Sequence, residues 1–290
     1  MPDKRHEKAD AFTRRMNKVL DHIDAHLAGD LRLEQLAALA AFSPFHFHRV
    51  FRAWTGETLQ DFVRRRRLEA AGGQLRFNPD ETVTEVAHAC GFASGESLAR
   101  AFHQHFGMTP TAWRQGGHRD WEAQQRPGYE RPETPYPGDI LVRAVPELQV
   151  VYLRHRGEYR KTVPGAWDAY ESWAAGIGLD GADKLGMGID DPTIVPASRC
   201  RYDTCAIPPE GWTPPGRISS KRVAGGAYAC LHYRGRRAGM SIAWRTLLVD
   251  WLPASGYALA ETPFVEAYAG ATNAGNTEDI EVELRMPLAG

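Results

Sequence analysis

The stretch GFASGESLARAFHQHFG, residues 91–107, decides the fold of the first part of this chain because it repeats an earlier stretch. The earlier copy is AFSPFHFHRVFRAWTG, residues 41–56. After one inserted residue, Arg49 of the first copy corresponds to Arg100 of the second. Because only two copies occur, we expect a duplicated supersecondary unit rather than a solenoid.

Each copy predicts a short helix, a tight turn and a longer helix. The short helices are expected over residues 33–40 and 82–89, and a further helix over residues 59–77 links the copies. Ser43 and Ser94 precede the longer helices, where a hydroxyl can accept a hydrogen bond from the first turn. A glycine follows each longer helix, as is common where a helix ends in the left-handed conformation.

The apolar residues of the longer helices recur at i, i+3, i+4 and i+7, which predicts one buried face on each helix. They are Phe47, Val50, Phe51 and Trp54 in the first copy and Leu98, Ala101, Phe102 and His105 in the second. The opposite faces are free to contact a partner. A metal site at His46 and His48 is not expected, because residues i and i+2 of a helix point apart.

One arginine recurs on the outward face of both copies, at Arg49 and Arg100. A helix-turn-helix places such a face in the major groove of DNA, where arginine can bond guanine O6 and N7. A basic face on a single helix is more often only solvated. Two copies with matching caps, core and arginine favour DNA binding. We interpret the run of arginines at residues 64–67 as a solvated face, from which one or two side chains could neutralise phosphates.

The bulk composition sets limits on the compartment and on metal binding. A net charge of −1 does not by itself indicate a nucleic-acid partner. The four cysteines have no zinc-site spacing, so buried thiols are predicted and no metal or other cofactor is expected. The longest apolar run, residues 36–42, is too short to span a membrane, and no signal peptide is recognised. The cytoplasm is the expected compartment.

The first part of the chain resembles the DNA-binding domain of the AraC family of transcriptional regulators. The resemblance lies in LEQLAALAAFSPFHFHRVFRAWTG and VTEVAHACGFASGESLARAFHQHFGMTPTAWR. It implies an all-α domain with two helix-turn-helix motifs, whose recognition helices lie about one DNA turn apart. The residues that this implies for DNA contact, together with Arg52 on the same face, are Phe45, His48, Arg49, Glu96, Ser97 and Arg100. Family members often carry glutamine where this chain has Gly95 and Glu96. A carboxylate there would accept from cytosine N4 but repel phosphate.

A stretch rich in Gly, Pro and charged residues, 114–139, separates two domains. We predict a DNA-binding domain over 1–116, a linker over 117–138 and a second domain over 139–290. The second domain is predicted to be α+β, with a duplicated βαββ unit. Strands are expected over 140–145, 150–156, 185–189, 200–207, 227–234, 264–268 and 280–286, and helices over 163–176 and 240–255. The two copies should form one curved antiparallel sheet with both helices on one side and a groove where they meet.

Glu266 is the candidate ligand-binding residue of the second domain. In TPFVEAYAG it shares one face of a predicted strand with Phe264 and Tyr268, because residues i and i±2 point the same way. A carboxylate between two aromatic rings can bind a cation. The alternative is that Glu266 faces solvent. Trp167 and Trp244 lie in the predicted helices, where each is individually more typical of a core residue than of a ligand contact.

The second domain resembles the GyrI-like effector-binding domain through the segments LRHRGEY, LGMGIDDP, CRYDTCAI and LPASGYALAETPFVEAY. The resemblance implies that Glu266 neutralises lipophilic cations and that Tyr202 contributes to the same pocket. The effector-binding residues predicted in this way, with the helix aromatics included, are Glu266, Phe264, Tyr268, Tyr202, Trp167 and Trp244. The identity of the ligand does not follow, because the aromatic lining varies among members.

Together these features predict a ligand-responsive transcriptional regulator without catalytic residues. Its expected partners are double-stranded DNA, a small lipophilic or cationic effector such as an aromatic cation, and RNA polymerase, and no membrane. Two alternatives concern the second domain. It could be a hydrolase whose pocket glutamate activates water, or a module that binds a protein partner.

Overall fold

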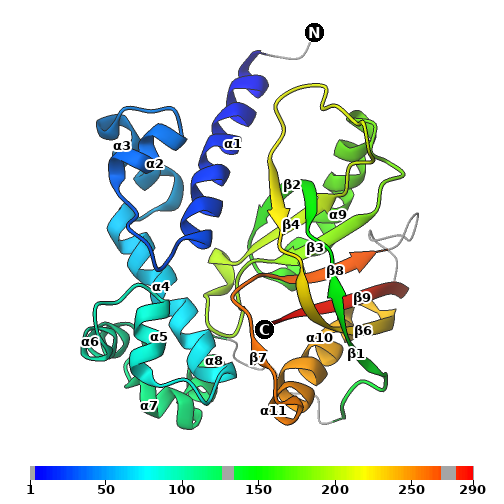
Figure 1. The fold of residues 1–290 in the computed structure, drawn as a ribbon. Helices are drawn as coiled ribbons and strands as arrows, with labels where there is room; N and C mark the ends of the chain where they lie inside the picture. Colours follow the sequence, from blue (N-terminus) through cyan, green and yellow to red (C-terminus); the bar gives the residue numbers. More distant parts are fainter. Residues whose placement is uncertain (1–3, 126–133, 269–278, 290) are drawn as a thin grey trace. The chain divides into compact units, whose positions relative to one another are not determined.

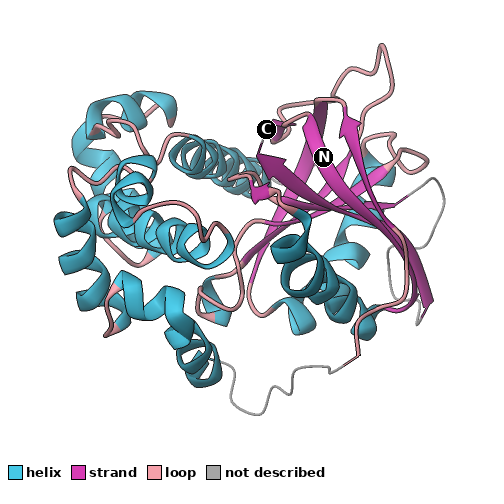
Figure 2. Cartoon of the chain, turned by 60° about the horizontal axis from the view of Figure 1, so that its bottom comes forward, coloured by secondary structure: helices cyan, strands magenta, loops and turns pink. Residues whose placement is uncertain are grey.

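The computed structural model describes residues 4–125, 134–268 and 279–289 (Figure 1). The chain divides into two compact units, Met1–Asp120 and Trp121–Gly290, called here the N-terminal and C-terminal units. The described part of the N-terminal unit contains helices but no strands, as the colours in Figure 2 show. The C-terminal unit carries the β-sheet.

The helices of the N-terminal unit follow the predicted order closely. They are α1 (Lys4–Ala25), α2 (Leu33–Leu39), α3 (Pro44–Thr55), α4 (Leu59–Phe77), α5 (Val83–Ala89), α6 (Gly95–Phe106), α7 (Pro110–Ala112) and the π-helical turn η1 (Trp113–Gly117). A further helix, α8 (His118–Gln125), continues across the boundary between the units. The sequence predicts a linker over residues 117–138, and the structure shows that the first part of this segment is helical.

Caps fix the ends of α3 and α6 at the predicted residues. The Ser43 hydroxyl accepts a hydrogen bond from the His46 amide at 3.4 Å. Gly56 and Gly107 end the two helices with φ of 83° and 74°. The turn before α3 contains Ala41 at φ 55°, a left-handed conformation that few residues other than glycine adopt. The matching residue of the second copy is Gly91, at φ 77°.

The predicted apolar faces of α3 and α6 point inward, although Val50, Trp54 and His105 are only half-buried. Phe47 and Phe51 have no exposed surface, and the ring of Phe51 meets that of Phe62 of α4 edge to face at 5.3 Å. In the second copy Phe102 packs edge to face on Trp113 at 5.5 Å. Each helix-turn-helix therefore has its own aromatic core, which fixes the opposite face of α3 and of α6 outward.

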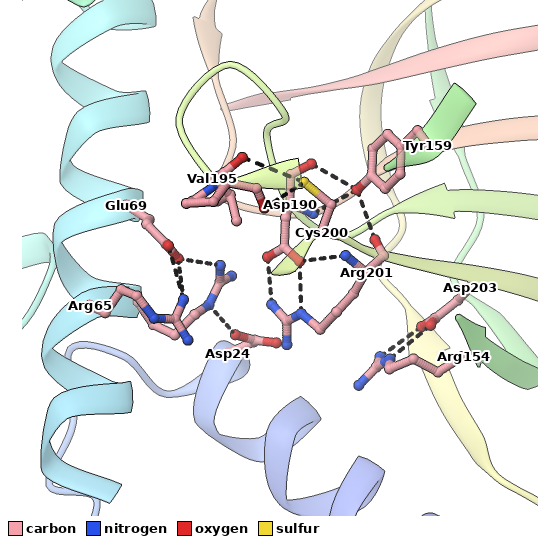
Figure 3. A network of polar contacts seen from close by, with 12 residues as sticks. Asp24, Arg65, Glu69, Arg154, Tyr159, Asp190, Val195, Cys200, Arg201 and Asp203 are labelled. Carbon is pink, nitrogen blue, oxygen red and sulfur yellow. Dashed lines mark hydrogen bonds and ion pairs between the residues drawn. The ribbon is translucent and has the colours of Figure 1, made fainter. Parts of the chain in front are cut away.

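The interpretation of residues 64–67 as a solvated face is wrong for three of the four arginines. Arg65 donates a hydrogen bond to the Glu57 carboxylate at 2.6 Å. It also donates to the Glu69 carboxylate at 2.9 Å, the contact drawn in Figure 3. Arg66 is buried and pairs with Asp24 and Glu69. Arg67 donates to backbone carbonyls of Leu27, Gly29 and Gly91. The run therefore attaches α4 to its neighbours, because Arg66 pairs with a residue of α1 and Arg67 bonds to the turns that follow α1 and α5.

The described residues of the C-terminal unit form a nine-stranded sheet in which every pair of neighbouring strands is antiparallel. Figure 2 shows its strands in magenta. The strands are β1 (Ile140–Val145), β2 (Leu148–Arg156), β3 (Lys184–Gly188), β4 (Arg201–Ala206), β5 (Ser220–Val223), β6 (Gly226–Arg236), β7 (Ala258–Leu259), β8 (Phe264–Tyr268) and β9 (Asp279–Ala289). The order in the sheet is β1-β6-β9-β8-β3-β4-β2-β5, with β7 paired to β9. The helices are α9 (Tyr159–Gly176), α10 (Met240–Arg245), the π-helical η4 (Thr246–Trp251) and α11 (Leu252–Ser255), and 3-10 turns occur at η2 (Ala197–Arg199) and η3 (Arg237–Gly239).

The duplication is visible in the strand order. The first repeat, β2-α9-β3-β4, and the second, β6-α10-β8-β9, meet where β3 pairs with β8. The short strand that precedes each repeat pairs with the other repeat. β1 precedes the first repeat and pairs with β6 of the second, and β5 precedes the second repeat and pairs with β2 of the first. Sequence reasoning missed β5 and β7. The four residues of β5, SKRV, are mostly polar and show no apolar alternation.

Both helices of the duplicated unit lie over the same face of the sheet, as predicted. Trp167 of α9 packs edge to face on Tyr268 at 5.0 Å between ring centroids. Trp244 of α10 stacks on Phe264 at 5.2 Å, with the rings inclined by 17°. Since Phe264 and Tyr268 alternate with buried Val265 on β8, they share the face that also carries Glu266.

Candidate functional sites

The outward face of α3 presents all four residues predicted for DNA contact in the first motif. Phe45 is 71% exposed, although it is a large apolar residue, and His48, Arg49 and Arg52 are exposed with it. The guanidinium of Arg49 lies 5.9 Å from the centroid of the Phe45 ring, one turn earlier. This cation–π contact can limit the motion of an arginine that solvent otherwise surrounds.

The outward face of α6 carries Glu96 and Arg100, which are 88% and 75% exposed and have an N–O separation of 3.9 Å. Ser97 is different. Its hydroxyl accepts from the Ser94 amide at 3.1 Å, while the Ser94 hydroxyl accepts from the Ser97 amide at 3.2 Å. The structure thus uses Ser97 in a capping box and leaves Glu96 and Arg100 as the exposed polar pair of the second copy.

Glu266 is buried, with 7% of its surface exposed, and does not face solvent. Its Oε2 accepts hydrogen bonds from the hydroxyls of Tyr202, at 2.6 Å, and Tyr268, at 2.9 Å. Burial, and then the Glu266 carboxylate, raise the pKa of both tyrosines well above the usual range. Both phenols therefore stay protonated at neutral pH and act as donors to the carboxylate, which replaces part of its lost hydration.

The structure brings together the six residues predicted for effector binding. Glu266, Tyr202, Tyr268 and Trp167 form one connected cluster, and the Phe264–Trp244 pair continues it along β8. We call these six residues the Glu266 cluster. Within the cluster the Trp167 Nε1, and next to Trp167 on α9 the Tyr170 hydroxyl, are buried without a hydrogen-bond partner among the described residues. Such unpaired donors in a buried site favour a ligand with acceptor atoms.

Sequence reasoning missed Gly186, which lies directly opposite Glu266 in the β3–β8 pair. A Cβ atom there would lie 2.7 Å from the Glu266 Oε2 and 2.9 Å from the Tyr202 Cζ. The glycine thus leaves room for the hydrogen bond between those two side chains. A glycine inside a strand indicates a close approach of this kind, and GMG within LGMGIDDP carried that signal.

Arg237 was missed as well. It begins η3, and its Nη1 donates to the Tyr268 hydroxyl at 3.3 Å. The RGRRAGM segment contains three arginines, and the sequence does not distinguish the one that turns toward β8.

All four cysteines are buried free thiols, as predicted. Across residues 4–125, 134–268 and 279–289, no three His, Cys, Asp or Glu side chains gather as a metal site would require. Within the same described ranges, no helix has the length and apolar character needed to cross a membrane.

The fold defines a class of protein in which a double helix-turn-helix unit is joined to a duplicated βαββ domain of the kind that binds small molecules. The two outward arginines belong to the first unit and the Glu266 cluster belongs to the second. The chain belongs to the GyrI-like family, because residues 139–289 match the GyrI-like small molecule binding domain, and residues 36–116 match a helix-turn-helix domain. Both resemblances noted from the sequence are thereby confirmed.

Curated relatives cover the smaller part of the chain. The regulatory protein PocR of Salmonella typhimurium is 35% identical over 101 residues, which are 35% of this chain and 33% of PocR. The "Probable transcription factor PqrA" of Proteus vulgaris is 30% identical over 104 residues, 35% of this chain and 84% of PqrA. The chain spans about one third of the length of PocR and of the relatives from Bacillus subtilis and Mycobacterium tuberculosis. Among solved structures, the DNA-binding domain of AdpA in complex with a target DNA is 30% identical, covering 40% of this chain and 98% of that domain with a TM-score of 0.34.

Proposed function

We propose that the protein is a ligand-responsive, sequence-specific DNA-binding transcriptional regulator. The observation that carries the proposal is the repeated arginine. Arg49 and Arg100 occupy the same position of two capped helices, both are exposed, and both lie opposite a buried aromatic core. Family membership in both units and the names of PocR and PqrA agree with this role.

The DNA-binding part of the proposal assigns the two recognition helices to adjacent major-groove segments. On α3 the contacts come from Phe45, His48, Arg49 and Arg52, and on α6 from Glu96 and Arg100, with Ser97 holding the helix cap. The two faces differ in chemistry, so one chain can recognise an asymmetric site without a two-fold axis. The arginine at each position is proposed to bond guanine.

The test for this part is DNase footprinting with affinity measurement on a selected operator. We expect Arg49→Ala and Arg100→Ala each to weaken binding by about 1–3 kcal/mol and to relax specificity at separate base pairs, because a bidentate arginine–guanine contact is lost. Arg222→Ala is the matched control, since Arg222 of β5 is as exposed as Arg100, at 75% of its side chain. Protection confined to one DNA turn, or affinity indifferent to both arginines, would contradict the proposal.

The effector part of the proposal assigns the Glu266 cluster to a small lipophilic molecule. The carboxylate offers a negative charge and the surrounding rings offer apolar contact and π faces. Ligand binding is proposed to change DNA affinity, or contact with RNA polymerase, by a coupling free energy of about 1–3 kcal/mol. We assign no catalytic role to the cluster and place the protein in the cytoplasm.

A calorimetric titration tests this part with two probes of matched shape. Methyltriphenylphosphonium is a lipophilic cation, and triphenylmethanol carries the same three phenyl rings without charge. We expect saturable binding of at least one probe to the wild-type protein and its loss in Glu266→Gln, with Glu281→Gln, an exposed glutamate of β9, as the control. Hydrolysis of phenyl acetate, added as a separate test substrate, would favour a hydrolase, and absence of both binding and hydrolysis would favour a protein-partner module.

A further inference from the structure

Arg237 brings a positive charge to the Glu266 cluster. Its Nη1 donates to the Tyr268 hydroxyl at 3.3 Å, and that hydroxyl donates to the Glu266 Oε2 at 2.9 Å. The Arg237 Cζ lies 5.9 Å from the centroid of the Tyr268 ring. One phenol therefore separates a guanidinium from the carboxylate, and the charge of Glu266 is already balanced within the chain.

The turn that carries Arg237 is closely packed. Arg237 opens the three-residue η3 between β6 and α10, and the Tyr233 hydroxyl donates to the carbonyl of the preceding residue, Arg236, at 2.5 Å. A Cβ atom at Gly239 would lie 2.7 Å from the same hydroxyl, so the turn fits around Tyr233. Because the backbone is held in this way, the guanidinium stays near Tyr268.

The free position on the carboxylate is Oε1. Both tyrosine hydroxyls bind Oε2, and among the described residues no hydrogen bond reaches Oε1. Glu266 as a whole keeps 7% of its surface exposed. An O–H or N–H group of a ligand can bond there.

A ligand with a lone positive charge would meet Arg237 as well as Glu266. Two like charges several ångströms apart in a half-buried site repel strongly enough to change a binding constant by about tenfold. An uncharged donor avoids this repulsion and still satisfies Oε1. The balance of charges therefore favours a ligand with no net charge.

We propose that Arg237 sets the charge selectivity of the Glu266 cluster, so that the protein prefers an uncharged aromatic molecule with an O–H or N–H donor over a lipophilic cation of the same shape. The inference rests on the proposed effector role of the cluster. It narrows the ligand class that the family resemblance implies, because the resemblance accounts for the glutamate and not for this arginine.

The test compares the affinities of triphenylmethanol and methyltriphenylphosphonium for the full chain. We expect the wild-type protein to bind the alcohol more tightly. In Arg237→Met and Arg237→Gln the affinity for the cation should rise about tenfold, while that for the alcohol changes by less than about twofold, because only the cation feels the removed charge. Arg237→Lys should keep the wild-type preference.

Arg234→Met is the matched control, since Arg234 is an exposed arginine of β6 that belongs to the opposite face of the sheet. It should leave both affinities unchanged. Wild-type preference for the cation, or equal changes for both probes in the Arg237 variants, would overturn the role of Arg237. If Glu266→Gln still abolishes binding in that case, the proposed effector site stands. Failure of both probes to bind the wild-type protein and Arg237→Met would overturn both proposals.

Discussion

At the scale of single residues, the Glu266 cluster is organised around a buried carboxylate. Glu266 has two phenol donors on one oxygen, a glycine opposite and an arginine beyond the second phenol. A buried carboxylate costs several kcal/mol unless such partners compensate for the lost water. Retaining it in place of an apolar residue indicates a role outside folding stability.

Gly186→Ala tests whether the close approach at β3 is needed. The added methyl group would collide with the Tyr202–Glu266 pair, so we expect the free energy of unfolding to fall by about 1–3 kcal/mol and probe binding to weaken. Gly165→Ala in α9 is the control, because nothing lies within 4 Å of its Cβ position, and a small gain in helix stability is expected there. Chemical denaturation and the titration above measure both. Unchanged binding in Gly186→Ala would show that the Tyr202 contact is dispensable.

The sequence predicts a residue of the cluster when its pattern is local. Glu266, Phe264 and Tyr268 follow from alternation along one strand. Gly186 and Arg237 acquire their roles only when β3 and η3 reach β8, and their own neighbours in the sequence do not indicate that contact.

At the scale of elements, helices with caps were predicted most closely. The ends of α3, α4 and α6 coincide with serine, threonine, asparagine or glycine residues that act over one turn. The predicted helix over 240–255 instead contains the π-helical η4 before Pro253, a residue that lacks the N–H needed to continue an α-helix. The short β5 escaped prediction because one polar strand is defined by its partner and not by its own pattern.

An ion cluster attaches β5 to the first repeat. Asp203 of β4 is fully buried and pairs with Arg154 of β2 at 2.7 Å and with Lys221 of β5 at 2.5 Å; the Arg154 pair is drawn in Figure 3. Burial alone would raise the pKa of the Asp203 carboxyl, but the two cations lower it to about 2. The cluster is therefore charged throughout the neutral and mildly acidic range.

Acid should release this cluster. Because the pKa of Asp203 is lower in the folded state than in the unfolded chain, its contribution is complete above about pH 5 and is lost as the pH falls toward 2. We expect about 2 kcal/mol of unfolding free energy to disappear over that range. Asp203→Asn should lack this pH dependence and lose about 3–5 kcal/mol at neutral pH, since the buried negative charge between Arg154 and Lys221 is removed. Urea unfolding of both proteins from pH 7 to 2 measures the effect; parallel pH profiles would contradict it.

At the scale of the whole molecule, duplication occurs in both units, with different results. The two helix-turn-helix copies keep separate cores, around Phe51 and around Phe102, so each recognition face can change independently. The two βαββ repeats share one sheet and contribute jointly to one cluster, with Glu266 from the second and Tyr202 from the first. The internal repeats are recognisable in the sequence, and the family resemblance already implied one pocket for Tyr202 and Glu266; the pairing of β3 with β8 shows how the two repeats bring them together.

Because β1 pairs with the second repeat and β5 with the first, the strands cannot pair in the order in which they are synthesised. Ile140 leaves the ribosome early, yet its neighbour in the sheet is Leu231, so β1 waits unpaired until β6 has been made. A stalled or truncated polypeptide that ends after the first repeat would contain β1 without its partner β6. The unpaired strand could then associate with other nascent chains. Complete translation of the C-terminal unit is thus itself a safeguard against aggregation.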